Sequence, residues 1–467
     1  MQTVKITADF NNKTGRNIRP MHGVGQAPIM GGEASVGTKM FHYLEEAGIP
    51  YSRLHDVAGT FGGGRFVDIP NVFRNFDADV NDPASYDFAH TDVLLKALLD
   101  FGVEPFYRLG ITIENAANIK AYHVFPPKDF QKWAEICEHI IRHYNEGWAD
   151  GYHYGIKYWE IWNEPDVALN PDEIAQTWHG TREEFFEFYK TAATHLKKCF
   201  GDSIMVGGYA SMGFAGFHYL DPDATGVKDF DFSTNDFTNP EYKRAYRVDY
   251  AHKFLAFVRD NNLPLDFFSW HCYTNVGPSM ILACEKHCRR VLANYGFEHV
   301  PDILNEWSAY RQDARLRGTP KVAADTLAVL LGSQRNEVDM LCYYDAGFGV
   351  SVYKGLWNPM TFTPFPTYYA FKSFNQAYKL KNEIATASFD EDVYVLGARN
   401  DEKGVIIIAN TKDESVTLDF EVTGIDIDSA EVIATDEEYL YTMLDDMIKD
   451  KRLTVKAHSM IEIRTKF

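Results

Sequence analysis

The amino-acid sequence predicts an α/β protein, a (β/α)8 TIM barrel with an accessory C-terminal β-sandwich domain. First, short apolar runs alternate with longer helical patterns between residues 16 and 374, as repeated βα units require. Second, several of these runs are apolar almost throughout, which is typical of parallel strands covered on both faces. Third, the residues after 374 form short strand-like runs separated by charged turns. We therefore expect a barrel over residues 16–374 and a sandwich made from residues 1–15 and 375–467.

The barrel strands are expected where aliphatic, β-branched and aromatic residues cluster between turn-forming residues. They are Met21–Gly25, Tyr51–Asp56, Glu104–Gly110, Tyr158–Asn163, Ile204–Ser211, Phe267–Tyr273, Asp302–Ser308 and Asp339–Asp345. Helical patterns lie between them at Phe130–Tyr144, Glu183–Cys199, Tyr246–Asn261, Met280–Tyr295 and Ala323–Arg335. Eight strands with intervening helices is the count of a (β/α)8 barrel.

The sandwich strands are expected at five short runs, which are Val393–Gly397, Gly404–Ala409, Val416–Val422, Ala430–Ala434 and Met460–Arg464. The opening segment Thr3–Phe10 alternates polar and apolar residues with a period of two. We expect it to join the sandwich. A free β-arm is the alternative, which we disfavour because an unpaired apolar strand promotes aggregation.

The charge balance disfavours binding to nucleic acid. The chain has 467 residues, with 46 Lys and Arg against 66 Asp and Glu, and a formal net charge of −20 at pH 7. No apolar run approaches the roughly 18 residues that a membrane span needs. The opening residues 1–9 lack the basic and apolar regions of a signal peptide. We expect a cytoplasmic protein that binds neither nucleic acid nor a membrane and whose sandwich offers a face for a homo-oligomer.

The cysteines predict reduced thiols. The six, Cys137, Cys199, Cys272, Cys284, Cys288 and Cys342, show neither paired spacing nor a dense framework. Cys284 and Cys288, with His287 between them, could share one helix face as metal ligands. We disfavour this reading because no second Cys or His pair follows to complete a tetrahedral set. We predict no metal and no cofactor.

Polar residues at the ends of the predicted strands should meet at the C-terminal mouth of the barrel. They are His22, Arg53, His55, Asp56, Arg108, Asn163, Glu164, His271, Tyr273, Asn305, Glu306, Tyr344 and Asp345. Charged groups at buried strand ends are costly unless they are paired, so Glu164 and Glu306 are informative. Hydrolysis of a glycosidic bond with retention needs two carboxyl groups about 5–5.5 Å apart. Strands four and seven face each other closely enough to supply them.

Four strand motifs resemble a known enzyme family. Trp159-Glu160-Ile161-Trp162-Asn163-Glu164-Pro165-Asp166 resembles the Asn-Glu-Pro signature of retaining barrel glycosidases, and Ile303-Leu304-Asn305-Glu306-Trp307 resembles their nucleophile strand. With the runs at residues 52–56 and 269–273, the sequence looks most like glycoside hydrolase family 39, which includes β-xylosidases and α-L-iduronidases. The resemblance covers essentially the whole chain and implies a barrel with an accessory β-sandwich.

The resemblance implies a role for each site residue. Glu164 would be the general acid/base, with its pKa raised by the neighbouring anion, and Glu306 the nucleophile. Asn163 would bind the sugar 2-hydroxyl. Arg53 and Tyr273 would donate hydrogen bonds to Glu306 and keep it ionised. The expected contacts to other hydroxyls come from His55, His271 and His22, and the expected apolar platforms for sugar faces from Trp307, Phe348 and Trp357.

Several of these residues have other interpretations. We expect Glu160 to be ion-paired rather than catalytic. We favour Asp56 and Asp345 as partners of Arg53 and Arg108 over a role as substrate ligands. His271 could instead be a hydrogen-bonded histidine of the barrel, and Phe348 and Trp357 could serve packing alone.

The predicted function is a retaining exo-glycosidase that acts on small glycosides or oligosaccharide ends. A β-D-xyloside is the first expected substrate, ahead of a β-galactoside, an α-L-arabinopyranoside and an α-L-iduronide. A divalent-metal sugar isomerase is a remote alternative, with an oxygen-rich site drawn from Asp56, Glu164, His271, Glu306 and Asp345. A carbohydrate-binding protein without activity is a third possibility on the same fold.

Overall fold

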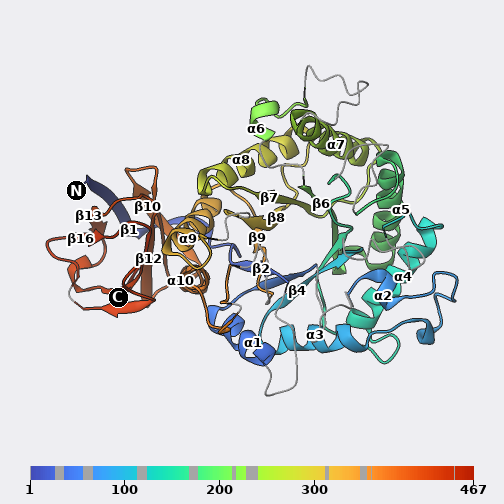
Figure 1. The fold of residues 1–467 in the computed structure, drawn as a ribbon, viewed down its shortest axis with the longest axis horizontal. Coiled ribbons are helices and arrows are strands. Elements are labelled where there is room, and N and C mark those ends of the chain that lie inside the picture. The colour runs from blue at the N-terminus through green and yellow to red at the C-terminus, as the bar shows by residue number, and fades with distance from the viewer. Residues whose placement is uncertain are drawn as a thin grey trace.

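The computed structural model describes residues 2–26, 36–55, 67–112, 124–167, 177–212, 217–227, 240–310, 315–347, 355–358, 360–445 and 447–467. Eight parallel strands close into a barrel in chain order, with the last strand paired to the first (Figure 1). The strands are β2 Gly23–Gly25, β3 Tyr51–Leu54, β4 Glu104–Leu109, β5 Tyr158–Ile161, β6 Met205–Ser211, β7 Phe268–Tyr273, β8 Asp302–Ser308 and β9 Met340–Tyr343. This confirms the predicted barrel.

The helices form a ring around the barrel (Figure 1). They are α1 Val36–Ala47, α2 Ile69–Val72, α3 Ala89–Asp100, α4 Phe130–Glu146, α5 Arg182–Phe200, α6 Phe217–Leu220, α7 Pro240–Asp260, α8 Pro278–Asn294, α9 Pro320–Arg335 and α10 Pro366–Leu380. Local sequence fixes their ends. Thr181 and Glu184 form a capping box at the start of α5, and Gly147, with φ 78°, ends α4.

A small cluster of inward-facing side chains fills the barrel. It consists of Phe106, Phe267, Ile303, Met340 and Cys342, which come from strands β4, β8 and β9 and from the residue before β7. Because these residues occupy the amino-terminal half, the polar residues further along the same strands point into the carboxyl-terminal half. The barrel is therefore a packed support for a polar site at its mouth.

The remaining strands form the accessory domain. They are β1 Gln2–Asn17, β10 Asn382–Ser388, β11 Val393–Arg399, β12 Lys403–Asn410, β13 Val416–Thr423, β14 Glu431–Thr435, β15 Thr442–Leu444, β16 Arg452–Val455 and β17 Ser459–Lys466. All nine belong to one hydrogen-bonded sheet, in the order β15-β14-β17-β12-β11-β10-β1-β13-β16. Buried residues from both ends of this order share one apolar cluster. The sheet is therefore folded over its own core, as in a sandwich.

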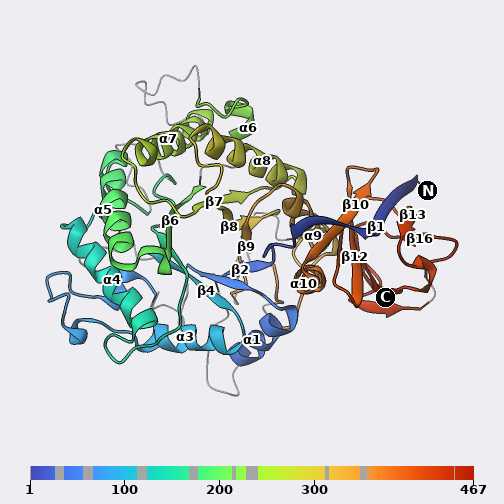
Figure 2. The same ribbon diagram turned by 180° about the vertical axis from the view of Figure 1, so that it is seen from behind.

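Strand β1 lies between two strands that are distant in sequence. It pairs antiparallel with β10 and parallel with β13. This confirms the prediction that the opening segment joins the sandwich. The domain lies beside α9 and α10, as both views show (Figures 1 and 2), and Gln334 on α9 donates from Nε2 to Glu383 Oε2 on β10 at 2.8 Å. Strands β10, β15 and β16 were not predicted from the sequence.

Two further observations concern expectations from the sequence. The predicted domain limits at residues 15/16 and 374/375 fall within β1 and α10 and stay a prediction. Within the described residues, no helix combines the length and the apolar character needed to cross a membrane.

Candidate active site

Glu164 sits just beyond β5 in a backbone turn that aims it at the barrel mouth. Trp162 and Glu164 both have positive φ, at 72° and 46°, so the chain leaves the regular strand geometry there. The Glu164 amide donates to the Ala210 carbonyl at 3.1 Å. Asp166 ties the turn to β6 by accepting from the Ser211 hydroxyl at 2.7 Å and from the Met212 amide at 3.0 Å.

Glu306 reaches the same mouth because β8 is irregular. The pairing of β7 with β8 shifts register between Trp270 and His271, so that His271 stands opposite Glu306. Neighbouring residues of a regular strand face opposite sides, but a bulge relaxes this rule. Asn305 and Glu306 both contact polar groups of the barrel interior, since Asn305 Nδ2 donates to Glu160 Oε1 at 2.6 Å and Glu306 accepts from Arg53.

Arg53, at the end of β3, links the acidic groups of the site. Its Nε donates to Glu160 Oε2 at 2.7 Å, its Nη1 to Glu306 Oε1 at 2.6 Å and its Nη2 to Asn163 Oδ1 at 2.7 Å. Burial alone would lower the pKa of Arg53, but the carboxylates of Glu160 and Glu306 outweigh it and raise the pKa. The guanidinium is therefore a fixed positive charge, and Glu160 is ion-paired as expected.

One further hydrogen-bond donor and a nearby histidine lie beside Glu306. The Tyr273 hydroxyl donates to Glu306 Oε2 at 2.6 Å, and His55 Nε2 lies 3.7 Å from Glu306 Oε1. With Arg53, these groups are arranged to stabilise a negative charge on Glu306. The predicted contacts of Arg53 and Tyr273 with Glu306 are present in the structure.

Glu164 and Glu306 face each other across His271. Ligand-type atoms of these three residues all lie within 4.8 Å of one another. His271 Nδ1 is 2.6 Å from Glu164 Oε1 and 3.5 Å from Glu306 Oε2. Burial is the main cause that lowers the pKa of His271 to about 4, so its imidazole is neutral at neutral pH. The Glu164 side chain is 14% exposed and that of Glu306 is 6% exposed, which leaves Glu164 the more accessible carboxyl group.

The oxygen-rich metal site of the isomerase alternative is poorly matched by these residues. Three of its five predicted ligands, Glu164, His271 and Glu306, do come together. Arg53, however, places a permanent positive charge 2.6 Å from Glu306 and would repel a divalent cation. The hydrogen-bond donors around Glu306 suit a free, charged carboxylate better than one that binds a metal ion.

Three residues predicted for sugar binding lie elsewhere. His22 precedes β2, at the amino-terminal end of the barrel, and its ring packs against Phe374 and Tyr378 of α10. Trp307 is fully buried and packs edge-on against Tyr343 in the layer between strands and helices. It follows Glu306 directly, so it points to the opposite side of the strand.

Trp357 is likewise buried. Its indole stacks on Tyr43 of α1, and its Nε1 donates to the Ala346 carbonyl at 2.7 Å. The platform predictions for Trp307 and Trp357 are therefore corrected, because buried indoles offer no face to a sugar. Phe348 and Asp56 lie outside the described residues.

Among the described residues, both arginines have partners that the sequence did not indicate. Arg53 binds Glu160, Glu306 and Asn163, and Arg108 Nη2 donates to Asp68 Oδ1 at 2.6 Å. Asp68, which pairs with Arg108, and Asp166, which ties the turn at Glu164 to β6, were not identified from the sequence. Asp166 follows Asn-Glu-Pro directly, so its place in the motif was the available signal, whereas Asp68 lies 40 residues from Arg108 and gave none.

Gln26, directly after β2, is a third residue that sequence reasoning missed. Its Nε2 donates to the Tyr344 hydroxyl at 2.5 Å, and the Tyr344 ring packs edge-on against Tyr273. Its position at a strand end was the signal that could have found it. It connects the first strand of the barrel to the donors around Glu306.

Known proteins are similar to this chain in sequence. The sequence model of the glycosyl hydrolases family 39 matches residues 33–310. A beta-xylosidase of Caldicellulosiruptor saccharolyticus is 30% identical over 175 residues, 36% of this chain and 32% of that protein. A beta-xylosidase of Geobacillus stearothermophilus is 22% identical over 352 residues, 67% of this chain and 61% of that protein. The chain thus spans less than two thirds of the length of either relative.

Solved structures share the fold over the full chain. A glucosidase from Croceicoccus marinus superposes with a TM-score of 0.73 at 19% identity, covering 99% of this chain and 98% of its own. A monomeric beta-xylosidase from Caulobacter crescentus superposes with a TM-score of 0.67 at 16% identity, covering 100% of this chain and 99% of its own. At these sequence identities, the similarity shows a shared fold and no more.

Proposed function

The chain belongs to glycosyl hydrolases family 39, and from that premise we propose that it is a retaining exo-glycosidase of the β-xylosidase type. The observation that carries the proposal is the approach of Glu164 to Glu306, since one carboxylate oxygen of each lies within 4.8 Å of the other. Retaining enzymes hold their two carboxyl groups about 5–5.5 Å apart, whereas inverting enzymes leave about 6.5–9.5 Å for a water. The spacing therefore supports double displacement.

In the first step, Glu306 attacks the anomeric carbon while Glu164 gives its proton to the glycosidic oxygen. The bond from C1 to the leaving group breaks, and a bond from C1 to a Glu306 oxygen forms. In the second step, Glu164 takes a proton from water, the water oxygen bonds to C1, and Glu306 leaves as a carboxylate. Arg53 and the Tyr273 hydroxyl stabilise that carboxylate before the first step and after the second.

Glu164 needs a proton in one step and must accept one in the next. In our proposal the charge of Glu306 raises the pKa of Glu164 before attack, and its neutralisation in the glycosyl-enzyme lowers that pKa again. Neutral His271, 2.6 Å from Glu164 Oε1, holds the carboxyl group in position without adding a competing positive charge. Asn163 is the proposed contact of the sugar 2-hydroxyl, with its Oδ1 oriented by Arg53.

A β-D-xyloside is the proposed substrate because both curated relatives carry the name beta-xylosidase. β-Galactosides and α-L-arabinopyranosides come next. An α-L-iduronide is disfavoured because its carboxylate requires a cation, and the donors of Arg53 are engaged by Glu160, Glu306 and Asn163. A panel of nitrophenyl glycosides measures this order directly.

Two variants test the mechanism. Glu306→Gln should abolish turnover, whereas Glu164→Ala should still cleave substrates with good leaving groups and should form a glycosyl azide when azide is added. The wild-type enzyme should release its first product with the anomeric configuration of the substrate, as read by NMR. Turnover by Glu306→Ala, or a first product of inverted configuration, would discard the assignment. Inactivation by EDTA would instead favour the metal isomerase.

A further inference from the structure

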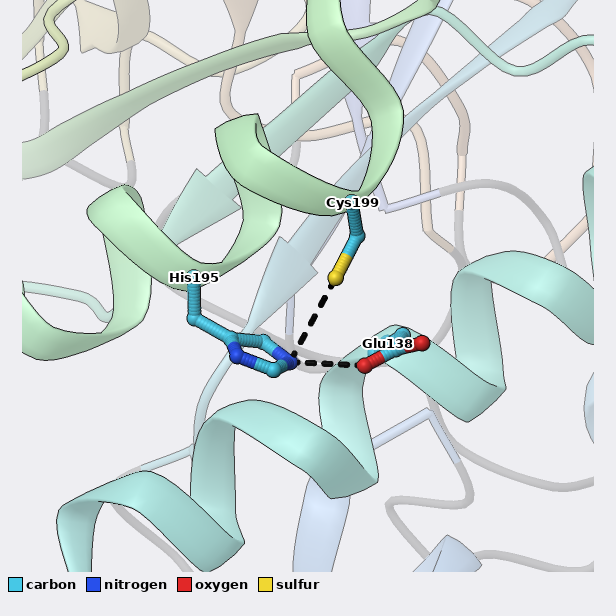
Figure 3. Close-up of side chains that lie close together, drawn as sticks. All are labelled: Glu138, His195 and Cys199. Atoms are coloured by element: carbon cyan, nitrogen blue, oxygen red, sulfur yellow. Dashed lines mark hydrogen bonds and ion pairs between the residues drawn. The ribbon is translucent and has the colours of Figure 1, made fainter.

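A second cluster of reactive side chains lies on the outer, helical layer of the barrel. Glu138 projects from α4, and His195 and Cys199 project from α5, so that the three side chains converge between the helices (Figure 3). The proposed glycosidase chemistry uses none of them. We propose that this cluster binds one Zn²⁺ ion or a similar thiophilic divalent cation.

The spacing of the three groups suits such an ion. His195 and Cys199 are four residues apart, so they share one face of α5. His195 Nε2 lies 2.7 Å from Glu138 Oε2 and 3.7 Å from Cys199 Sγ. Tetrahedral zinc has bonds of about 2.0–2.3 Å, which places its ligand atoms roughly 3.3–3.8 Å apart. Small side-chain adjustments would therefore admit the ion, with water as a fourth ligand.

Hydrogen bonds at the edge of the cluster leave Glu138 Oε2 and His195 Nε2 facing its centre. Arg142 Nε donates to Glu138 Oε1 at 2.8 Å, so the other carboxylate oxygen is the one directed at His195. The Arg142 side chain is 32% exposed, whereas that of Arg53 is 1% exposed, so solvent screens the repulsion between Arg142 and a cation. On the far side of the imidazole, Gln131 Nε2 lies 3.0 Å from His195 Nδ1. A half-turn of the Gln131 amide would present its oxygen to a protonated Nδ1, in exchange for the hydrogen bond that Nε2 donates to Glu135 Oε1 at 3.1 Å. Such outer hydrogen bonds orient metal-binding imidazoles.

The chemistry of Cys199 also fits. It is the partly exposed member of the six cysteines, since the other five are buried. A thiol binds zinc in its deprotonated form, so its proton must leave when the ion binds. Binding would release this proton to solvent and form a sulfur–metal bond, while the imidazole proton moves from Nε2 to Nδ1. No oxidant or reductant is needed.

The thiols singled out from the sequence do not form such a cluster. Cys288 Sγ lies 3.6 Å from Asp302 Oδ1, whereas His287 Nε2 lies 3.4 Å from Asp221 Oδ2. These two contacts draw the side chains toward different carboxylates. The proposed metal-binding pattern is thus His-x3-Cys on α5 with Glu on the preceding helix, α4.

The proposed site is remote from the barrel mouth. Cys199 is the second-last residue of α5, and the chain then enters β6 at Met205, which is the amino-terminal end of the barrel. An ion there would clamp α4 to α5. Its effect should therefore be on stability, and glycosidase turnover should be unchanged.

Titration of the metal-free, full-length protein with Co²⁺ tests the site, because thiolate-bound Co²⁺ gives charge-transfer absorption that oxygen and nitrogen ligands do not. We expect this absorption to saturate at one equivalent per chain. It should disappear in Cys199→Ser and His195→Ala and weaken in Glu138→Gln. The matched control is His42→Ala, which removes an exposed histidine paired with Glu45 at 3.4 Å but with no thiol. It should behave as the wild type.

Zn²⁺ should also raise the thermal midpoint of the wild type by several degrees and leave that of Cys199→Ser unchanged. A wild-type protein without the charge-transfer band, or a band that persists in Cys199→Ser, would overturn the proposal. An ion bound near Glu164 instead would inhibit turnover and give no thiolate band, and that result would equally refute it. None of these readouts depends on which glycoside is cleaved.

Discussion

Replacing Tyr273 by Phe is the most direct test of the hydrogen-bond donors around Glu306, because it removes one hydroxyl and keeps the ring. The Tyr273 hydroxyl lies 2.6 Å from Glu306 Oε2, within the range of hydrogen bonds to a charged oxygen. Such a bond contributes about 1.5–3 kcal/mol. Arg53 still donates to the other oxygen at 2.6 Å, so the site should stay assembled.

The two chemical steps should respond differently to Tyr273→Phe. Glu306 loses its negative charge during attack on the sugar and regains it when the glycosyl-enzyme is hydrolysed. The missing donor therefore penalises the second step and leaves the first unhindered. If about half of the charge has returned at the transition state, the loss is about 0.75–1.5 kcal/mol, or roughly a 4- to 13-fold slower second step.

Rapid mixing with a dinitrophenyl glycoside measures this difference. We expect a burst of dinitrophenolate equal to the enzyme concentration, followed by a slower steady rate and a lower KM. Tyr144→Phe is the control, because it removes a hydroxyl that donates to Asp92 at 3.0 Å in the helical layer. It should leave the kinetics unchanged. An unchanged steady rate in Tyr273→Phe, or an equal loss in both steps without a burst, would refute the reasoning.

Three further variants test other parts of the structure. In Arg53→Lys, the lysine cannot span the three partners and leaves Glu160 or Glu306 poorly paired. The free energy of unfolding in urea should fall by about 3–5 kcal/mol and kcat/KM by about 10²-fold or more. Wild-type values would contradict this. Burial raises the pKa of Glu285 to about 8, above the roughly 4.3 of an unfolded chain, so its stabilising contribution is lost as pH rises between these values. Glu285→Gln should therefore lose less stability between pH 5 and pH 8 than the wild type, and parallel curves would argue against it. Trp307→Phe should lower the free energy of unfolding by about 1–3 kcal/mol with KM unchanged, and a higher KM would return Trp307 to the sugar site.

The convergence of Glu164, Glu306, Arg53 and Tyr273 could be predicted because each ends a parallel strand, and strand ends meet at one mouth. The roles of the tryptophans could not. Trp307 follows a bulge at which two successive residues contact the interior, and a bulge leaves no mark in hydrophobic periodicity.

The other differences have separate physical origins. His22 is the second residue of the strand expected at Met21–Gly25 and precedes β2, which begins at Gly23, so the histidine lies at the amino-terminal end of the barrel and not at the mouth. The pairing of Arg108 with Asp68 joins segments 40 residues apart, beyond the reach of local patterns.

The position of β1 between β10 and β13 has a consequence for how the protein is made. During translation β1 leaves the ribosome long before either partner, because the whole barrel is encoded between them. At about 5–20 residues per second, this delay is roughly 20–70 s. Throughout it the apolar face of Val4, Ile6 and Ala8 has no sheet to cover it. A nascent chain that stalls within the barrel therefore exposes an unpaired apolar strand, which promotes aggregation.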